Sequence, residues 1–346
     1  MTVRTELPTF ELSVERHATV PPEARGMARD DVRLLVVDDG LTHSRFRELP
    51  DRLRPGDLLV VNNSATMSSA VDATADGEPV VLHFSTWLDD GRWVVEVRTT
   101  ERTPYPAERL SAGTVLRLPG AAATLRAPWL AGGRRLWSAE VTGDVPLLLA
   151  AHGCPITYSY VLQRWSADYY TTVFGRVPGS AEMPSAARPF TERLVLDLIA
   201  AGVALAPITL HAGVSSPETG EPPSPERFAV SAATARLVND TKAAGGRVVA
   251  VGTTVTRALE TAADLSGLVH ASRGWTDLVL GGRRPAHVVD GLITGWHAPG
   301  ASHLDLLVAV AGAETVAAAY ATAVETGYLW HEFGDSALLF GRGALS

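Results

Sequence analysis

The chain has 346 residues, of which 46% are hydrophobic and 20% are charged, and its formal net charge is −8. One core stops growing at roughly 250 to 300 residues, so we expect two domains, and the even spread of glycine and proline excludes a disordered or low-complexity protein. The negative charge argues against a surface that is basic throughout, so a nucleic-acid partner would need a local basic region.

No membrane segment is expected. Residues 1–12 alternate charged, polar and apolar side chains, without the basic segment and apolar run of a secretion signal. The longest apolar stretch, residues 304–313, is interrupted by Asp305 and is far shorter than the roughly 20 residues that cross a membrane. We therefore expect a cytoplasmic protein without a membrane partner.

Two residue types occur once each and limit the chemistry. Cys154 is the only cysteine, which excludes an intramolecular disulfide and a cysteine-based zinc cluster. Lys242 is the only lysine and lies in a polar segment typical of a helix end, which disfavours Schiff-base chemistry of the pyridoxal type.

The first third of the chain predicts strands. Residues 33–37 and 57–61 are short runs of valine and leucine bounded by turn residues, as in buried strands. Brief alternating runs separated by turns then follow at residues 79–84, 92–98, 114–118, 121–125 and 136–141. Such spacing is typical of a small antiparallel barrel or sandwich. We predict an inserted β-barrel domain at residues 69–149, and an α/β main domain formed by residues 1–68 and 150–346.

Beyond residue 147 the pattern alternates between strands and helices. Thr191 and Ser231 are predicted to cap helices at 191–201 and 231–244, each of which ends at glycine. Strands are predicted at 203–210 and 247–251, further helices at 256–263, 302–311 and 314–325, and extended segments at 278–280 and 286–289. This alternation predicts a layered α/β body.

The turn Gly252-Thr253-Thr254 follows a buried strand and precedes a helix. Backbone N–H groups and hydroxyls at such a junction suit an anionic or carboxylate ligand, although similar junctions occur in any α/β protein. Arg257 lies one turn further on, where it either reaches the same ligand or pairs with Glu260.

Several titratable residues are candidates for proton transfer. His211 ends a predicted strand, while His297 and His303 lie in a later loop and helix. Each is either a cleft residue or a packed one, and their irregular spacing predicts no metal site. Glu226 and Asp335 lie beside aromatic residues in turns, where each is either a general base or a surface carboxylate.

Taken together, ordered segments along the chain resemble a known family. They are residues 29–34, 43–46, 55–60, 168–184, 209–211, 252–254, 274–277, 290–294 and 328–335. Over nearly the full length, their order and spacing resemble the S-adenosylmethionine:tRNA ribosyltransferase-isomerases of queuosine biosynthesis. The resemblance implies an α/β main domain with a β-barrel insertion.

The resemblance also implies a reaction. The ribosyl part of S-adenosylmethionine passes to an aminomethyl-deazaguanine of tRNA and rearranges to an epoxycyclopentanediol, with release of adenine and methionine. The sulfonium acidifies the adjacent ribose carbon, so no metal is needed. The protein must supply a base, an acid for adenine and pockets for both leaving fragments.

Four segments depart from the family pattern. Residues 62–71 lack an acid and two arginines that the family usually has, and residues 183–190 lose a histidine and gain Arg188. Ser215-Ser216-Pro217 replaces a Gly-Thr-Phe segment, and residues 295–299 replace Asn-Phe-His-Leu-Pro. These changes lie where the chemistry or the tRNA would be handled.

Site residues are carried over only where the motifs match. The catalytic candidates are His211, Glu226, Asp335 and His297. The candidates for binding S-adenosylmethionine are Gly252, Thr253, Thr254, Arg257 and Asp277.

Three functions remain open from the sequence. The first is the ribosyltransferase-isomerase of tRNA, and the second uses S-adenosylmethionine with a small-molecule acceptor, which fits the negative charge and the lost arginines. The third is a nucleoside-binding family member without catalysis. The sequence fixes neither the acceptor nor the oligomeric state.

Overall fold

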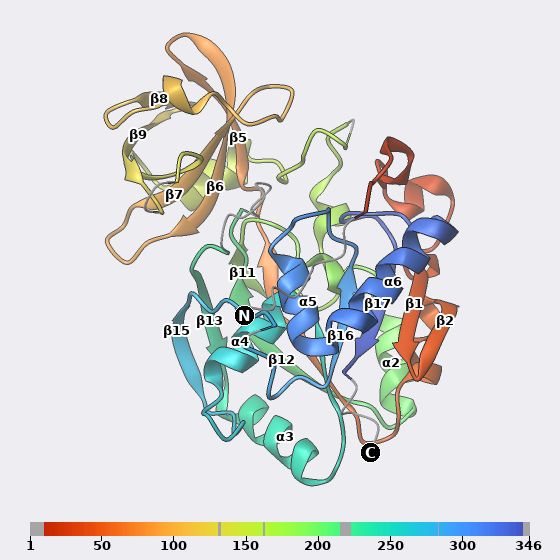
Figure 1. Cartoon of the computed structure of the whole chain (residues 1–346). Helices are drawn as coiled ribbons and strands as arrows, with labels where there is room; N and C mark the ends of the chain where they lie inside the picture. The colour runs from red at the N-terminus through yellow and green to blue at the C-terminus, as the bar shows by residue number, and fades with distance from the viewer. Residues whose placement is uncertain (1–9, 131–132, 162, 215–222, 283, 342–346) are drawn as a thin grey trace, which may run out of the picture.

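The computed structural model describes residues 10–130, 133–161, 163–214, 223–282 and 284–341. Figure 1 shows two bodies, a large α/β body and a smaller β body above it. Within the described residues the large body contains a nine-stranded sheet in the order β15-β13-β12-β3-β14-β16-β17-β1-β2. Its strands are β1 (Arg33–Asp38), β2 (Gly40–Arg45), β3 (Leu58–Asn62), β12 (Ala204–His211), β13 (Glu226–Val230), β14 (Val248–Val251), β15 (Ser272–Thr276), β16 (Gly291–Gly295) and β17 (Ser336–Phe340).

The centre of this sheet is parallel. Strands β12, β3, β14 and β16 run in the same direction, so their carboxyl ends meet at one edge. Strand β17 is antiparallel to β16, and β13 is antiparallel to β12. Open α/β sheets bind ligands outside the carboxyl ends of such strands, so this edge is the place to look for a site.

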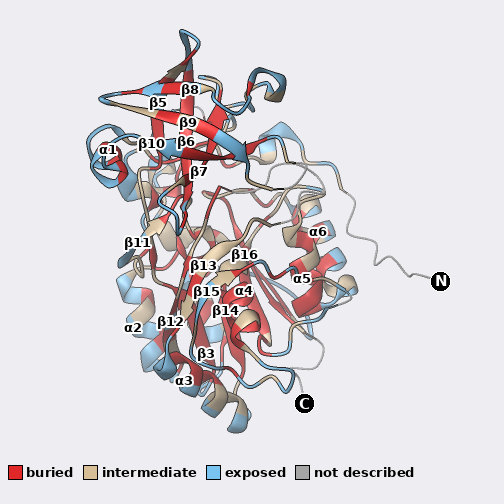
Figure 2. Ribbon diagram, turned by 90° about the vertical axis from the view of Figure 1, so that its left-hand side faces the viewer, coloured by how far each residue is buried: buried red, intermediate tan, exposed pale blue. Residues whose placement is uncertain are grey.

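Helices cover both faces of the sheet. They are α2 (Glu192–Ala200), α3 (Ala232–Ala243), α4 (Thr253–Ala262), α5 (His303–Ala311) and α6 (Ala313–Thr326). Side chains of α3, α4, α5 and α6 pack on one face, whereas α2 packs on the other. Figure 2 shows buried residues concentrated in the strands and exposed residues on the outer sides of α2 and α3.

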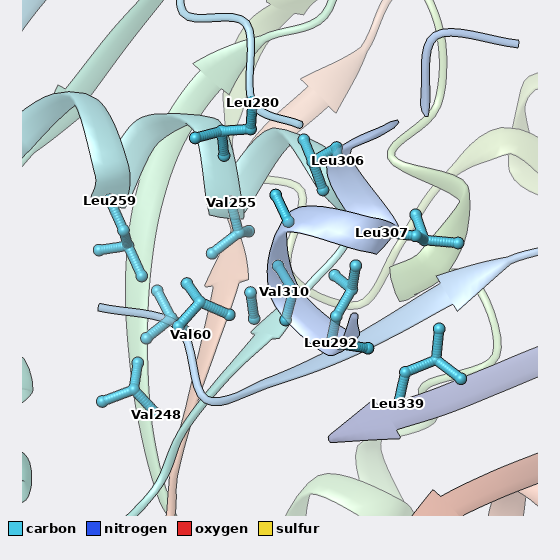
Figure 3. Packing of buried hydrophobic residues seen from close by; sticks show 14 of the residues in the cluster. Val60, Val248, Val255, Leu259, Leu280, Leu292, Leu306, Leu307, Val310 and Leu339 are labelled. Atoms are coloured by element: carbon cyan, nitrogen blue, oxygen red, sulfur yellow. The ribbon is translucent and has the colours of Figure 1, made fainter. Parts of the chain in front are cut away.

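Alternation along the strands divides the core into two layers. In β3, Leu58 and Val60 point into the layer under α4 and α5, while Leu59 and Val61 point into the layer under α2. Such side-to-side alternation is the two-residue period of a strand. Figure 3 shows Val60 beside Val255 and Leu259 of α4, so the helix that follows the Gly252 turn is fixed against the sheet.

The smaller body is a closed antiparallel barrel in the order β10-β7-β6-β5-β8-β9. Its strands are β5 (Ala70–Ala75), β6 (Glu78–Trp87), β7 (Trp93–Arg98), β8 (Val115–Leu118), β9 (Ala121–Pro128) and β10 (Leu136–Val141), and α1 (Val145–His152) follows them. The predicted barrel inserted in an α/β domain is confirmed. The boundaries 69–149 stay a prediction, which the range of the barrel strands, 70–141, supports.

Short elements complete the fold. A parallel pair consists of β4 (Ser64–Thr66) and β11 (Val177–Ser180). The short 3₁₀ helices are η1 (Val14–Arg16), η2 (Pro22–Arg25), η3 (Arg29–Asp31), η4 (Phe46–Arg52), η5 (Ala107–Arg109), η6 (Ala167–Tyr170) and η7 (Ser185–Ala187). No single helix in the described ranges is long and apolar enough to cross a membrane, although α5 and α6 would suffice together by length and composition and meet at a bend of 119°.

Most predicted elements form, and some differ. Thr191 and Ser231 cap α2 and α3 through their side chains, as predicted. The segments predicted as extended, 278–280 and 286–289, form neither helix nor strand. Residues 287–289 donate their backbone N–H groups to Glu260. Helix α4 begins at Thr253, three residues before the predicted start, because the turn at Gly252 already points the chain into the helix.

A buried ion pair joins two parallel strands at their amino-terminal ends, on the side of the sheet away from the carboxyl edge. Arg247 at the start of β14 donates to Asp57 before β3, with Nη2 at 2.6 Å from Oδ2, and both side chains are at most 6% exposed. Asp57 also accepts from the backbone N–H of Arg54 at 2.8 Å. Without Asp57, the buried Arg247 would keep only a longer contact, 3.5 Å from its Nη1 to Oδ2 of Asp38, so its charge would be poorly compensated.

Asp57→Ala is therefore expected to lower the free energy of unfolding by about 3 to 5 kcal/mol, measured by urea denaturation. The matched control is Asp197→Ala, which removes an exposed pair with Arg193 on α2 and should leave the transition unchanged. Equal transitions for the two variants would contradict a stabilising role for the buried pair.

Candidate functional site

A cavity of about 540 Å³ lies at the carboxyl edge of the parallel strands. The turn after β14, the loop after β16 and the start of α5 line it from the main domain, and residues 98 and 102–104 of the barrel line it from the other side. This volume lies within the range of small-molecule sites, which often occur between domains. The position matches the edge where parallel α/β sheets bind ligands.

The turn between β14 and α4 forms part of the cavity wall. Gly252 has φ +98°, a value that L side chains rarely adopt, and an added Cβ would lie 3.4 Å from the Cβ of Ala186. No side chain caps α4, so the backbone N–H groups of its first turn have no side-chain acceptor among the described residues. Gly252, Thr253 and Thr254 all line the cavity. The turn therefore leaves N–H donors for an acceptor on a ligand.

Arg257 and Glu226 form a buried ion pair in the same wall. Arg257 also donates to the carbonyl oxygens of Leu278 at 3.1 Å and Thr276 at 3.2 Å, and Glu226 accepts from the N–H of Gly213 at 3.0 Å. Burial raises the pKa of Glu226, and the charge of Arg257 opposes that rise. Arg257 thus joins α4 to β13 and to the coil after β15.

The expected alternative pairing of Arg257 with Glu260 does not occur. The carboxylate of Glu260 accepts from the backbone N–H groups of His287, Val288 and Val289 at 2.9 to 3.1 Å. Glu260 therefore fixes the segment before β16, and Arg257 points to the cavity side of α4.

Two histidines that line the cavity have parallel rings. The rings of His297 and His303 stack with centroids 4.5 Å apart and an interplanar angle of 1°. His297 Nε2 lies 3.0 Å from the hydroxyl of Thr294 at the end of β16. Burial lowers the pKa of His297 well below its ordinary value and that of His303 to about 4. Both rings are therefore neutral at pH 7, and the burial that keeps them neutral also disfavours their protonation.

A further wall combines tyrosines with carboxylates, and we refer to Tyr158, Tyr160, Glu182 and Glu332 as the Tyr–Glu wall. Tyr160 donates to Glu332 at 2.7 Å, and Tyr158 donates to Glu182. His331 stacks on Tyr160 with centroids 4.0 Å apart. Burial raises the pKa of Glu332 to about 7, and the charge of Glu182 adds to that rise. Glu332 therefore ionises at a higher pH than an ordinary glutamate.

Sequence reasoning missed the Tyr–Glu wall. Tyr158 and Tyr160 have the two-residue spacing that puts side chains on one side of an extended segment, and this was the available signal. The family-like segment 328–335 contains both Glu332 and Asp335, and the sequence prediction names Asp335. Asp335 is buried outside the cavity, where its carboxylate accepts from the N–H groups of Arg33 and Leu329, each at 2.8 Å.

Two other predicted site residues also lie outside the cavity lining. His211 is next to lining residues, but its Nδ1 lies 2.8 Å from the hydroxyl of Ser64, and its ring packs so closely on Gly179 that a Cβ there would overlap it. Asp277 is exposed, at the end of the strand that pairs with Glu226. The structure thus brings together six of the nine predicted site residues: Glu226, His297, Gly252, Thr253, Thr254 and Arg257.

The departures from the family pattern have structural counterparts. Arg188 is 2% exposed, donates to Glu23 and to the carbonyl of Tyr169, and lies outside the cavity. In the segment that lacks the family arginines, Thr66 lines the cavity. Ser215-Ser216-Pro217 lies outside the described residues, and Gly295 to Ala298 line the cavity.

No group of three or more His, Cys, Asp or Glu side chains suitable for a metal occurs in the described ranges.

Cys154 has a structural environment. It lies where the chain leaves the barrel region, and its backbone exchanges hydrogen bonds of 2.8 and 2.9 Å with Ala70. Burial raises the pKa of its thiol, so the reactive thiolate is disfavoured.

The sequence pattern of the family described as "Queuosine biosynthesis protein" matches residues 6–339. Two relatives named S-adenosylmethionine:tRNA ribosyltransferase-isomerase are similar over nearly their whole length. The relative from Methylobacterium radiotolerans is 34% identical over 98% of this chain and 98% of its own, and that from Moorella thermoacetica is 35% identical over 95% and 98%.

A solved structure is similar as well. The crystal structure of the S-adenosylmethionine tRNA ribosyltransferase from Thermotoga maritima matches 95% of this chain and 98% of its own, with a TM-score of 0.52 and 28% identity. The similarity covers both the barrel and the α/β body of this chain.

The ionisation of Glu332 gives a testable pH dependence. Its pKa of about 7 in the folded protein lies above the ordinary value of 4.5. The contribution of Glu332 to the free energy of unfolding is therefore fully present below pH 4.5, and it is lost as the pH rises through about 7. Glu332→Gln cannot ionise. Urea midpoints measured from pH 5 to 8 should therefore rise for Glu332→Gln relative to the wild type as the pH increases.

The control for this measurement is Glu325→Gln on the exposed side of α6, whose difference from the wild type should not change with pH. Parallel curves for the wild type and Glu332→Gln would show that Glu332 ionises at its ordinary pKa.

Proposed function

Since this chain belongs to the queuosine biosynthesis protein family, we propose that its cavity is the site where S-adenosylmethionine donates its ribosyl group to a tRNA base. The protein is a transferase and isomerase that uses S-adenosylmethionine as substrate and functions in queuosine modification of tRNA. The observation that carries the site assignment is the open Gly252 turn beside titratable side chains in one cavity.

The cavity offers groups for each part of the reaction. The backbone N–H groups in the first turn of α4, which have no side-chain acceptor among the described residues, suit an acceptor atom on the nucleoside. The buried Arg257–Glu226 pair keeps the adjacent wall in place. Proton removal from the ribose carbon beside the sulfonium needs a base. Glu226 and His297 are the predicted candidates that line the cavity, and Glu332 joins them because it lines the cavity with a pKa raised to about 7.

The acceptor is proposed to be tRNA because the relatives are named for it. A small-molecule acceptor is the second candidate. It is favoured by the net charge of −8, and by Thr66, which lines the cavity in the segment that lacks the two family arginines. A cytoplasmic location follows from the proposed tRNA substrate.

Adenine release tests the function and separates the acceptors. The purified protein is incubated with S-adenosylmethionine and with tRNA that carries the aminomethyl-deazaguanine, and adenine is followed by chromatography. We expect release that depends on the tRNA. Release without RNA would favour the small-molecule acceptor, and the absence of release with tRNA would contradict the proposed function.

The role of the Gly252 turn is tested by Gly252→Ala. The backbone there has a positive φ, and the added methyl would narrow the turn against Ala186, so we expect the Kd for S-adenosylmethionine to increase about tenfold or more, in line with a strain of about 1 to 3 kcal/mol. Calorimetric titration gives the Kd.

Gly245→Ala is the matched control. Gly245 has φ +78° at the end of α3, and an added Cβ there meets no atom within 4 Å. Gly245→Ala introduces similar backbone strain away from the cavity, so the Kd of this variant for S-adenosylmethionine should equal that of the wild type. Equal affinities for both variants would remove the Gly252 turn from the site.

A further inference from the structure

His303 is the first residue of α5, and it lines the cavity beside His297. We refer to these two residues as the histidine pair. Nε2 of His297 lies 3.0 Å from the hydroxyl of Thr294, whereas the ring nitrogens of His303 have no hydrogen-bond partner among the described residues. Neither nitrogen of His303 is fully enclosed by protein, so a partner for this ring has to come from the cavity.

The histidine pair lies next to the Gly252 turn. The backbone N–H of Gly252 donates to the carbonyl of Ile293 at 2.8 Å, so the end of β16 lies against this turn. The following residue, Thr294, holds His297 through its hydroxyl. The ring of His303 then stacks on that of His297 with centroids 4.5 Å apart and an interplanar angle of 1°. His297 therefore gives the ring of His303 a flat and fixed support.

The surroundings of His303 are apolar. Leu306 lies three residues further along α5, on the same side of the helix, and it lines the cavity together with residues 278–280. Burial, and then the charge of Arg257, lower the pKa of His303 to about 4. The charge of Arg257 is itself paired with Glu226. His303 thus presents a neutral imidazole, which has one N–H donor and one acceptor nitrogen, in apolar surroundings.

Among the parts of S-adenosylmethionine, the adenine base matches this lining best. Adenine is flat and uncharged near neutral pH, and its ring nitrogens N1, N3 and N7 accept hydrogen bonds. The amino-acid part carries an ammonium and a carboxylate, and the ribose hydroxyls each need a polar partner. Leucine side chains and one neutral imidazole would leave those charged and polar groups poorly paired, at a cost in free energy.

We propose that the histidine pair is the adenine subsite of the cavity, where the N–H of His303 donates a hydrogen bond to a ring nitrogen of adenine. This inference rests on the proposed function, in which adenine is the base of the substrate. His303 is the residue that touches the base, and His297 is a positioning residue that supports its ring. A single bond between neutral partners typically changes the affinity about fivefold.

Deaza analogues of S-adenosylmethionine test this bond one nitrogen at a time. The 1-, 3- and 7-deaza analogues each replace one ring nitrogen by C–H, and their Kd values are measured by calorimetric titration without tRNA, above neutral pH. The wild type should bind S-adenosylmethionine about fivefold more tightly than one of the three analogues. His303→Phe keeps a flat ring against His297 but has no nitrogen, so this preference should disappear and the Kd for S-adenosylmethionine should rise about fivefold.

Two conservative variants test for rescue. The amide N–H groups of asparagine and glutamine lie near the positions of Nδ1 and Nε2, so either His303→Asn or His303→Gln should retain the preference that His303→Phe loses. The matched control is His287→Phe, because His287 is exposed and lies outside the cavity lining. This control should have the wild-type Kd for S-adenosylmethionine and for each analogue.

The outcomes distinguish the subsite from the proposed function. If the wild type does not bind S-adenosylmethionine, the proposed function fails. If the wild type binds it without preference for any ring nitrogen, or if His303→Phe keeps the wild-type Kd values, the subsite is overturned and the function stands. Equal weakening of all compounds in His303→Phe would assign the ring a packing role and overturn the hydrogen bond. Unchanged Kd values with a raised KM for tRNA would place the histidine pair at the acceptor base and overturn the adenine assignment.

Discussion

The buried ion pair between Arg257 and Glu226 is the interaction on which the site depends. Removing two charges from water is costly, and here the cost is offset by further hydrogen bonds to both partners. These bonds reach α4, β13, the coil after β15 and the backbone at Gly213, which are four separate segments of the chain. Because Gly213 also packs against the barrel residue Ser85, the pair couples the α/β wall of the cavity to the barrel. The cavity is therefore a product of both domains.

The fold could be predicted from the sequence where a local rule decides it. Ser231 caps a helix because its side chain accepts from a backbone N–H three residues on, and no distant contact is needed. The short runs between turns likewise predicted the barrel. The isolated runs at 278–280 and 286–289 have strand-like composition but no partner strand, and pairing is a property of the whole sheet.

The site was predictable only where it follows from an element boundary. The Gly252 turn is fixed by the strand before it and the helix after it, so its residues could be located by pattern. The loop before β17 has no such periodicity. His331 has φ +74°, and this turn of the backbone sends Glu332 into the cavity while Asp335 reaches the N–H groups of Arg33 and Leu329. Sequence alone does not distinguish these two acids.

Burial disfavours the charged forms of the histidines and of Glu332 in the cavity. His297, His303 and His331 are neutral near pH 7, and the pKa of Glu332 is raised to about 7. A bound cation favours the ionised form of Glu332, and by linkage the ionised form of Glu332 favours the cation. Ligand binding and deprotonation of Glu332 are thus coupled.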